Sequence, residues 1–293
     1  MFGMGSARVR AGMVATALVA TVALTVVVVQ ASASGTQRAK LAAVPKHMSL
    51  KEAARAAQAS LRSQAGPQAS AIVDNVPSTV SCGQTLTAST TLTANLVCEG
   101  QNGLMLGASG IVLNLNGHSI SGSVDKQDST TGVADNVAKD TIENGYIEGF
   151  EYGVDATGAA DAVTNVQVNY ADYIGIFLQG SANKATSDTA AENFGDGIFD
   201  EGSGDTVQSD HLLNNEGNGL VVDDSGAKVL DNVADGNTFF GIGADGGLAT
   251  LTGNTANYNG ELGIDAASPM IDGGSNKAMG NGTKEQCRGV VCS

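Results

Sequence analysis

Short apolar runs recur along the chain at a nearly constant interval. Each run begins at a glycine that is usually followed by an aliphatic residue, as in GIVLNLNG and GLVVD. The runs are short and rich in β-branched residues, and no helical periodicity lies between them, so they predict coils of short strands joined by turns. Successive glycines are 21 or 22 residues apart, at Gly110, Gly132, Gly153, Gly175, Gly197, Gly219, Gly241 and Gly263.

Two columns of Asn and Asp residues follow the same interval. One contains Asn193, Asn215, Asn237, Asn259 and Asn281, and the other contains Asp188, Asp210, Asn232, Asn254 and Asn276. An Asn side chain both donates and accepts hydrogen bonds, so identical residues in stacked coils can bond to one another along the stack. We therefore predict structural ladders, and we expect the repeated glycines to supply the positive φ of tight corners.

Two longer segments carry a family resemblance. IVLNLNGHSISG at 111–122 and DTIENGYIEGFEYGV at 140–154, together with the glycine-led coils, resemble the secreted right-handed parallel β-helix proteins of the pectin-lyase-like superfamily. The resemblance covers about residues 76–293 and implies an all-β fold, a right-handed parallel β-helix with coils of about 22 residues. It implies no single activity, because that superfamily includes lyases, glycosidases, epimerases and noncatalytic proteins.

The chain before the repeats differs in composition. Two arginines precede an apolar stretch that ends in Ala31-Ser32-Ala33, which predicts a secretory signal peptide over residues 1–33 and an extracellular protein. An uncleaved membrane anchor is the alternative, because the apolar stretch approaches spanning length. Residues 34–75 are predicted to be a linker with a short helix, since Ser49 and Glu52 have capping-box spacing.

The β-helix domain is predicted over 76–293, with an N-terminal cap at 76–109, repeat coils at 110–282 and a tail at 283–293. Its four cysteines favour two disulfides in an exported chain, and the local pairs Cys82–Cys98 and Cys287–Cys292 are preferred. A zinc site is the rival interpretation, but the cysteines lack CxxC spacing and nearby histidines.

Charge is distributed unevenly along the chain. Residues 1–75 hold 8 of the 15 Lys and Arg residues but only 2 of the 30 Asp and Glu residues. The remainder is strongly acidic, so it would be repelled by nucleic acid and by anionic membrane surfaces. A membrane partner is expected only if the signal segment is retained, and the protein is expected to be a monomer.

Strand alternation predicts which residues face outward after each repeated glycine. The second position places Phe177 and Phe199 outside, and the fourth places there Gln179, Glu201, Asp223 and Asp245. Carboxylates stacked about 5 Å apart repel one another unless a cation, a raised pKa or water relieves the repulsion. Glu201, Asp223 and Asp245 are therefore candidate Ca²⁺ ligands or catalytic acids, and a solvated acidic face is the simplest alternative.

Two functions remain open from the sequence. The first is a noncatalytic exported protein that binds a polysaccharide or cell-envelope glycan through Phe177, Phe199, Gln179 and Asp200. The second is a carbohydrate-active enzyme, a glycoside hydrolase more than a lyase, with catalytic residues Glu201, Asp223 and Asp245. The chain lacks the further motifs of polygalacturonases, and a lyase would need a basic residue where the domain offers a single arginine, Arg288.

Overall fold

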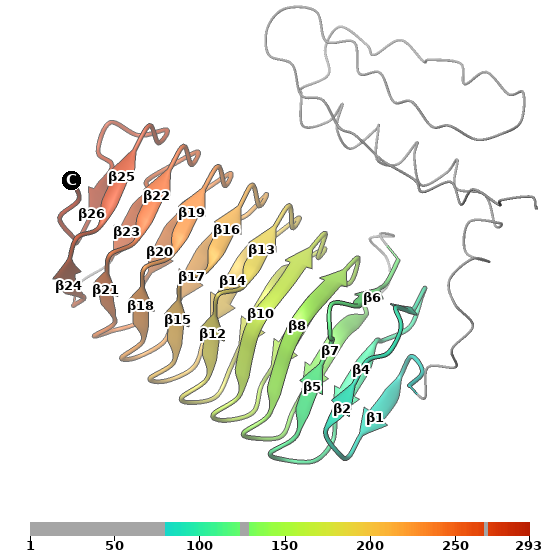
Figure 1. Cartoon of the computed structure of the whole chain (residues 1–293). Helices are drawn as coiled ribbons and strands as arrows, with labels where there is room; N and C mark the ends of the chain where they lie inside the picture. The colour runs from blue at the N-terminus through green and yellow to red at the C-terminus, as the bar shows by residue number, and fades with distance from the viewer. Residues whose placement is uncertain (1–79, 124–128, 267–268) are drawn as a thin grey trace, which may run out of the picture. The chain divides into compact units, whose positions relative to one another are not determined.

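The computed structural model describes residues 80–123, 129–266 and 269–293, which form one stack of coils (Figure 1). These residues form strands and turns without a helix, and each strand pairs in parallel with its equivalent in the next coil. In most coils equivalent residues are 22 positions apart, as Ile176 and Ile198 are, whereas the first coils and the last one depart from this interval. The predicted all-β parallel helix is confirmed, while the predicted signal peptide (1–33) and linker helix (34–75) lie outside the described residues.

One face of the stack is a ten-stranded sheet, called the first sheet. Every coil contributes one strand to it, and the strand order follows the chain. Strands from the predicted cap, 76–109, pair with those of later coils and so belong to the stack. The strands are β1 (Gln84–Leu86), β4 (Leu104–Leu106), β7 (Thr131–Asp135), β9 (Tyr152–Ala156), β11 (Ile174–Leu178), β14 (Asp196–Asp200), β17 (Leu220–Val222), β20 (Ile242–Ala244), β23 (Ile264–Ala266) and β26 (Cys287–Arg288).

The second sheet has sixteen strands and forms the other two faces. Its two rows are joined through β8 (Thr141–Glu148) and β10 (Ala162–Asn169), long strands that pair with both rows. The first row contains β2 (Thr90–Thr91), β5 (Val112–Asn114), β12 (Lys184–Thr186), β15 (Thr206–Gln208), β18 (Lys228–Leu230), β21 (Thr250–Thr252) and β24 (Ile271–Gly274). The second row contains β3 (Leu96–Val97), β6 (Ser119–Ser121), β13 (Thr189–Ala191), β16 (His211–Leu213), β19 (Val233–Asp235), β22 (Thr255–Asn257) and β25 (Lys277–Met279).

Alternation along the strands builds the core between the sheets. In β11, Ile176 and Leu178 are fully buried, whereas Phe177 between them is partly exposed. Strands of successive coils repeat this pattern, so aliphatic side chains stack on their own equivalents along the interior. The predicted inward and outward positions are thereby confirmed, and burial of this continuous apolar interior is the main favourable term in folding.

Each coil turns at three corners, and the same local device recurs at each. A residue with positive φ is followed by an inward-pointing residue, as where Asn214, with φ of 56°, precedes the buried Asn215. Asn tolerates this left-handed conformation better than most residues. Corner one follows the first sheet, corner two lies between the rows of the second sheet, and corner three leads to the next coil.

The asparagine ladder at corner three connects successive coils. Asn237 Oδ1 accepts hydrogen bonds from the backbone N–H and the Nδ2 of Asn215, at 2.9 and 3.0 Å. Its own Nδ2 donates to Asn259 Oδ1 and to the backbone oxygen of Leu212, both at 3.0 Å. The same contacts recur along the column, so every buried amide is satisfied and the predicted ladder is confirmed.

The C-terminal tail ends this ladder. Gln286 Oε1 accepts from both the backbone N–H and the Nδ2 of Asn281, at 3.0 and 2.9 Å, and so takes the place of a further Asn. The next residue, Cys287, forms a disulfide with Cys292. At the opposite end Cys82 pairs with Cys98, so both predicted disulfides are confirmed.

The prediction that the repeated glycines supply positive φ is wrong for seven of the eight. Gly110 alone among them has a positive φ, of 79°. The others lie where neighbouring coils leave no room for a side chain. A Cβ on Gly241 would lie 2.6 Å from both the backbone oxygen of Gly263 and the Nδ2 of Asn259. Close packing against the neighbouring coil therefore accounts for these glycines, and from Gly175 onward the packing includes the asparagine ladder.

Corner two carries the second predicted ladder, which begins with two aspartates. Asp210 Oδ1 accepts from the Asp188 backbone N–H at 2.7 Å, and Asn232 Oδ1 accepts from the Asp210 N–H at 2.9 Å. Asn232 also donates its Nδ2 to the backbone oxygen of Val207 at 2.9 Å. An ionised Asp cannot donate in this way, and Asp210 Oδ2 is buried without a partner.

We expect Asp210→Asn to stabilise the fold by about 1–3 kcal/mol above neutral pH. Burial, and then the charge of Asp188, raises the pKa of Asp210 well above its ordinary value, and burial raises the pKa of Asp188 to about 7. Ionisation is disfavoured in the folded state, so the stability that these carboxyls contribute is full at acid pH and is lost as pH rises through about 7. Asn at 210 cannot ionise and supplies the missing donor.

Urea unfolding at about pH 5 and about pH 8 tests this expectation. The parent should lose stability between the two values, and Asp210→Asn should lose less. An equal pH dependence in both proteins would contradict it. Asp231→Asn is the control, because Asp231 lies at the same corner one coil away and is exposed.

Corner one carries a third ladder, which was not predicted. The Asp140 backbone N–H donates to Asp161 Oδ1 at 3.1 Å, the Asp161 N–H to Asn183 Oδ1 at 2.9 Å, and the Asn183 N–H to Asp205 Oδ1 at 2.8 Å. The next equivalent residue is an alanine, and Asp224 takes over by accepting from the Asp205 N–H at 2.8 Å. Asp224 is therefore an internal cap for this ladder.

Candidate functional site

The outer face of the first sheet carries aromatic side chains on three neighbouring strands. Phe177 in β11 pairs in register with Phe199 in β14, and their ring centres lie 5.9 Å apart. Tyr152 begins β9, on the other side of β11, and its ring centre lies 6.1 Å from that of Phe177. All three side chains are partly exposed, so they form a continuous apolar strip that solvent can reach.

Tyr173 extends this strip. Its ring meets that of Tyr152 edge-on, with centres 5.5 Å apart, and the residue is 56% exposed. Alternation after the repeated glycines identifies the two phenylalanines but not the tyrosines, which precede the glycines in the chain. An aromatic residue directly before Gly153 is the signal that could have identified Tyr152. We call Tyr152, Tyr173, Phe177 and Phe199 the aromatic stripe.

A column of polar side chains runs beside the stripe, where strands of the first sheet end. Gln179, Glu201, Asp223 and Asp245 take equivalent positions in four successive coils, and all are exposed, as the alternation predicts. Gln179 Nε2 donates to Glu201 Oε2 at 3.4 Å. Burial, followed by the charges of Asp245 and Glu201, raises the pKa of Asp223. We call these four residues the polar column.

Asp200 does not belong to this face. It ends β14 and is fully buried between the sheets, as its inward position requires. Its carboxylate therefore cannot reach a ligand that lies on Phe177 and Phe199. The prediction that Asp200 contacts a surface ligand is wrong, because the burial of its position overrides the usual exposure of aspartate.

Arg288 lies farther along the first sheet and is already paired. Its Nε donates to Asp265 Oδ1 at 2.6 Å. This hydrogen bond, and then the charge of Asp265, raises the pKa of Arg288 above its ordinary value. The arginine that a lyase mechanism would need as a base is thus held in its protonated form.

Comparison with protein families decides the identity of the fold. Residues 85–278 match the family described as “Right handed beta helix region”. The chain belongs to the right-handed β-helix family. The match covers most of the described coils and confirms the family predicted from the sequence. No curated protein matches the chain at a significant level.

Several solved structures resemble this β-helix protein. The A-module of the Azotobacter vinelandii mannuronan C-5 epimerase AlgE6 is 14% identical, with a TM-score of 0.46 over 71% of this chain and 69% of that one. Pectate lyase Pel9A is 16% identical, with a TM-score of 0.44 over 70% of this chain and 68% of that one. The Dettilon tailspike protein is 14% identical, with a TM-score of 0.36 over 67% and 54%. At such identities the likeness concerns the fold alone.

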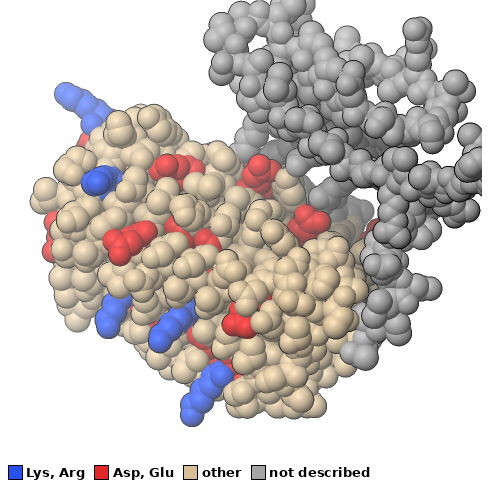
Figure 2. Space-filling view, in the orientation of Figure 1, with Lys and Arg blue, Asp and Glu red and all other residues tan. Residues whose placement is uncertain are grey.

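The face of this right-handed β-helix protein that Figure 2 shows is mostly uncharged, with scattered acids. Figure 2 shows carboxylate groups dispersed over the visible face and a few Lys and Arg side chains near its margins. Within the described residues, no helix has the length and apolar character needed to cross a membrane.

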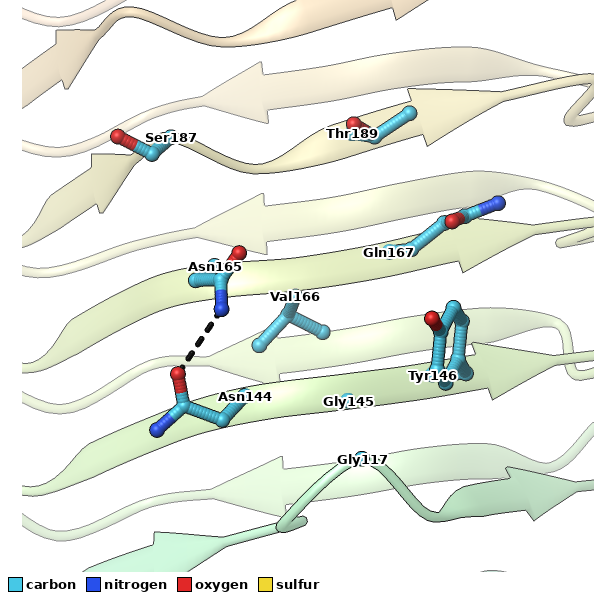
Figure 3. Close-up of a pocket in the computed structure, with 9 residues that line it drawn as sticks. All are labelled: Gly117, Asn144, Gly145, Tyr146, Asn165, Val166, Gln167, Ser187 and Thr189. Carbon is cyan, nitrogen blue, oxygen red and sulfur yellow. Dashed lines mark hydrogen bonds between the residues drawn. The ribbon is translucent and has the colours of Figure 1, made fainter.

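A second surface feature lies on the second sheet. A shallow depression of about 250 Å³ crosses β8, β10 and the start of β13 (Figure 3). Tyr146, Gln167 and Thr189 form a row across it on neighbouring strands. At its other side Asn165 Nδ2 donates to Asn144 Oδ1 at 2.9 Å. The depression carries no charged side chain and only one aromatic ring, so it is a weaker candidate than the aromatic stripe.

Carboxylates come together most closely inside the protein. In two buried triads, one oxygen from each of three aspartates lies within 4.8 Å of the others. Within the described residues, Glu201, Asp223 and Asp245 do not form such a group, so Ca²⁺ binding by the polar column remains a prediction. The triads are Asp135, Asp140 and Asp161, and Asp200, Asp205 and Asp224.

Proposed function

We propose that this protein binds carbohydrate on the outer face of the first sheet. The observation that carries the proposal is the run of Tyr152, Phe177 and Phe199 rings, with centres 6.1 and 5.9 Å apart on three paired strands. Aromatic rings offer large, rigid apolar surfaces, on which the C–H faces of sugar rings can stack. Gln179 and the carboxylates beside the stripe provide partners for sugar hydroxyl groups.

The charge of the polar column restricts the class of glycan. Glu201, Asp223 and Asp245 are exposed acids in consecutive coils, and their field repels an anionic chain such as a polyuronate. The proposed ligand is therefore a neutral or amino-bearing polysaccharide. A rigid, flat array of paired strands suits an extended chain, because binding then costs little conformational entropy in the protein.

We also place this binding outside the cytoplasm. The disulfides Cys82–Cys98 and Cys287–Cys292 support an oxidising compartment, where such bonds persist. A glycan of the cell envelope or of the surroundings would be accessible there. Protease protection of the protein in intact cells, compared with its release into the medium, tests this placement.

Loss of the stripe should abolish binding. A glycan array identifies the ligand, and calorimetry then measures its affinity for the full chain. We expect Phe177→Ala and Phe199→Ala each to weaken binding about tenfold or more, because hot-spot aromatic residues contribute on the order of 2 kcal/mol. Both side chains are only partly buried, so each variant should retain the fold, which circular dichroism checks.

Tyr146→Ala is the matched control. Tyr146 is an aromatic residue of the same solenoid, 48% exposed, but it lies in the depression on the second sheet. Its removal should leave the affinity unchanged. Equal affinity of the parent and both phenylalanine variants would contradict the proposal. Loss of binding in Tyr146→Ala alone would show that the glycan binds in the depression instead.

A glycoside hydrolase is the second candidate function. Asp223 favours it, since its pKa is raised by burial and by two flanking acids, as a general acid requires. On this alternative Asp223→Asn and Glu201→Gln would abolish release of oligosaccharides from the bound glycan without weakening its binding. If the parent releases none from the array ligand, the noncatalytic function stands.

A further inference from the structure

Two groups of aspartates lie inside the solenoid with part of their hydrogen-bonding capacity unused. In the first, Asp140 and Asp161 belong to the ladder at corner one, and Asp135 points inward at the end of β7. One oxygen of each aspartate accepts a backbone N–H. Asp140 accepts from Ile111, Asp161 accepts from Asp140, and Asp135 accepts from Val137. The second oxygen of each is buried without a protein partner.

The second group repeats this arrangement three coils later. Asp200 takes the position of Asp135, and Asp205 takes that of Asp140. Both oxygens of Asp200 and Oδ2 of Asp205 are buried without partners. Asp224, which accepts from the N–H groups of Gly204 and Asp205, completes the group. The first triad thus has one unused oxygen on each of its three residues. In the second, the unused oxygens belong to Asp200 and Asp205, while both oxygens of Asp224 already accept backbone N–H groups.

The coil between the two triads lacks both of these acids. In the intervening coil, the position equivalent to Asp200 is Leu178, and the ladder position equivalent to Asp205 is Asn183. In the described coils, an inward aspartate at the end of a first-sheet strand occurs only where the ladder residue of that coil is also an aspartate. When both are ionised, the inward aspartate and the ladder aspartate cannot hydrogen-bond to each other, because ionised carboxylates only accept.

No buried Lys, Arg or His of the described coils accompanies either group. Among the described residues, every Lys, Arg and His lies at the surface or is partly exposed, and the buried polar side chains are Asp, Asn and Thr. Lys139, next to Asp140 in the chain, is exposed. Three buried carboxylates without a counter-charge would be strongly unfavourable.

We propose that each triad holds a divalent cation, Ca²⁺, between neighbouring coils. Hard cations with oxygen ligands suit an all-carboxylate site, and Ca–O distances of about 2.3–2.6 Å allow ligand oxygens to lie up to about 5 Å apart. In each triad, one oxygen from each of the three aspartates lies within 4.8 Å of the other two. Because the triads are fully buried, the ion enters as the coils assemble, and it ties corner one to the first sheet.

A proton shared between carboxyl groups is the competing arrangement. Burial, followed by the charges of Asp205 and Asp224, raises the pKa of Asp200 to about 9 when no cation is present. The two arrangements differ in their response to calcium, since a proton-linked triad would be indifferent to it.

The test uses the full chain unfolded in chelator and refolded with or without Ca²⁺. We expect elemental analysis after desalting to find two Ca²⁺ per chain, and a melting temperature roughly 5 °C or more higher with Ca²⁺ well above its Kd. Asp200→Asn and Asp135→Asn should each bind one Ca²⁺ and keep about half of the thermal gain. Asn is isosteric with Asp, and circular dichroism confirms folding.

Asp223→Asn is the matched control for the exposed polar column. It should retain both bound ions, and loss of the calcium response in this variant would assign the metal to the surface instead. The proposal is overturned if the refolded parent holds no Ca²⁺, or if Asp200→Asn and the parent bind equal amounts. In either case glycan binding by the aromatic stripe is unaffected, so the two proposals fail separately.

Discussion

Asn237→Ala is expected to destabilise the solenoid by about 3–6 kcal/mol, because it removes a central member of the ladder at corner three. The change deletes two hydrogen bonds that Asn237 Nδ2 donates, to Leu212 and Asn259. It also leaves the buried backbone N–H and Nδ2 of Asn215 without the acceptor they share. Each buried unsatisfied group costs about 1–3 kcal/mol, so the losses accumulate at one point of the stack.

Equilibrium unfolding in urea measures the effect, with Gln179→Ala as the control. Gln179 is exposed, and its amide makes one contact, at 3.4 Å, so its removal should change stability by less than about 0.5 kcal/mol. The stability loss of Asn237→Asp should lie between those of Asn237→Ala and Gln179→Ala, because Asp keeps the acceptor and loses the donor. This loss should grow as pH rises, because the buried carboxyl then ionises. A loss below about 1 kcal/mol for Asn237→Ala would show that the ladder contributes little.

Gly241→Ala is expected to be the second severe change, by steric conflict instead of lost hydrogen bonds. A Cβ at 241 would lie 2.6 Å from the Gly263 oxygen and the Asn259 Nδ2, and 2.8 Å from the Ala256 Cβ. These atoms belong to the backbone, the ladder and the core, so relief requires neighbouring coils to separate. We expect a loss of about 2–4 kcal/mol, in the range that overpacking of a core produces.

Gly243→Ala provides a control two residues farther along, in β20. A Cβ there would meet its nearest neighbour, Phe240, at 3.6 Å, which is ordinary contact, and Gly243 has no positive φ. This variant should be neutral or slightly stabilising, because alanine restricts the unfolded chain more than glycine does. Thermal melts of the two variants side by side measure the contrast, and similar losses would contradict the packing explanation of the repeated glycines.

Most of the architecture could be predicted because, in a solenoid, the repeat interval of the sequence determines which residues contact one another. Residues 22 apart are neighbours in space, so the columns of Asn193 and Asp188 already identify which side chains meet. The same reasoning places Glu201, Asp223 and Asp245 on one face. Sequence spacing does not reveal close approach of backbones, which is why the role of Gly241 was assigned to φ instead of to packing.

The candidate site was harder to predict, since its members come from different positions of the repeat. Tyr152 joins Phe177 only through the pairing of β9 with β11, and it lies before the glycine instead of after it. The ladder at corner one is likewise broken by Ala227 and rescued by Asp224 from another position. Asp200 is the one acid at the third position after the last five repeated glycines, which marks it as unusual in the sequence. Only the fold shows which carboxylates surround it.

The central claim is that the aromatic stripe is a carbohydrate-binding surface. Its most direct test is a crystal structure of the full chain soaked with the best glycan from the array. We predict a saccharide lying across Tyr152, Phe177 and Phe199, with sugar faces on the rings and hydroxyl groups toward Gln179 and Glu201. A saccharide bound in the depression beside Tyr146, or a glycan array without any ligand, would contradict the claim.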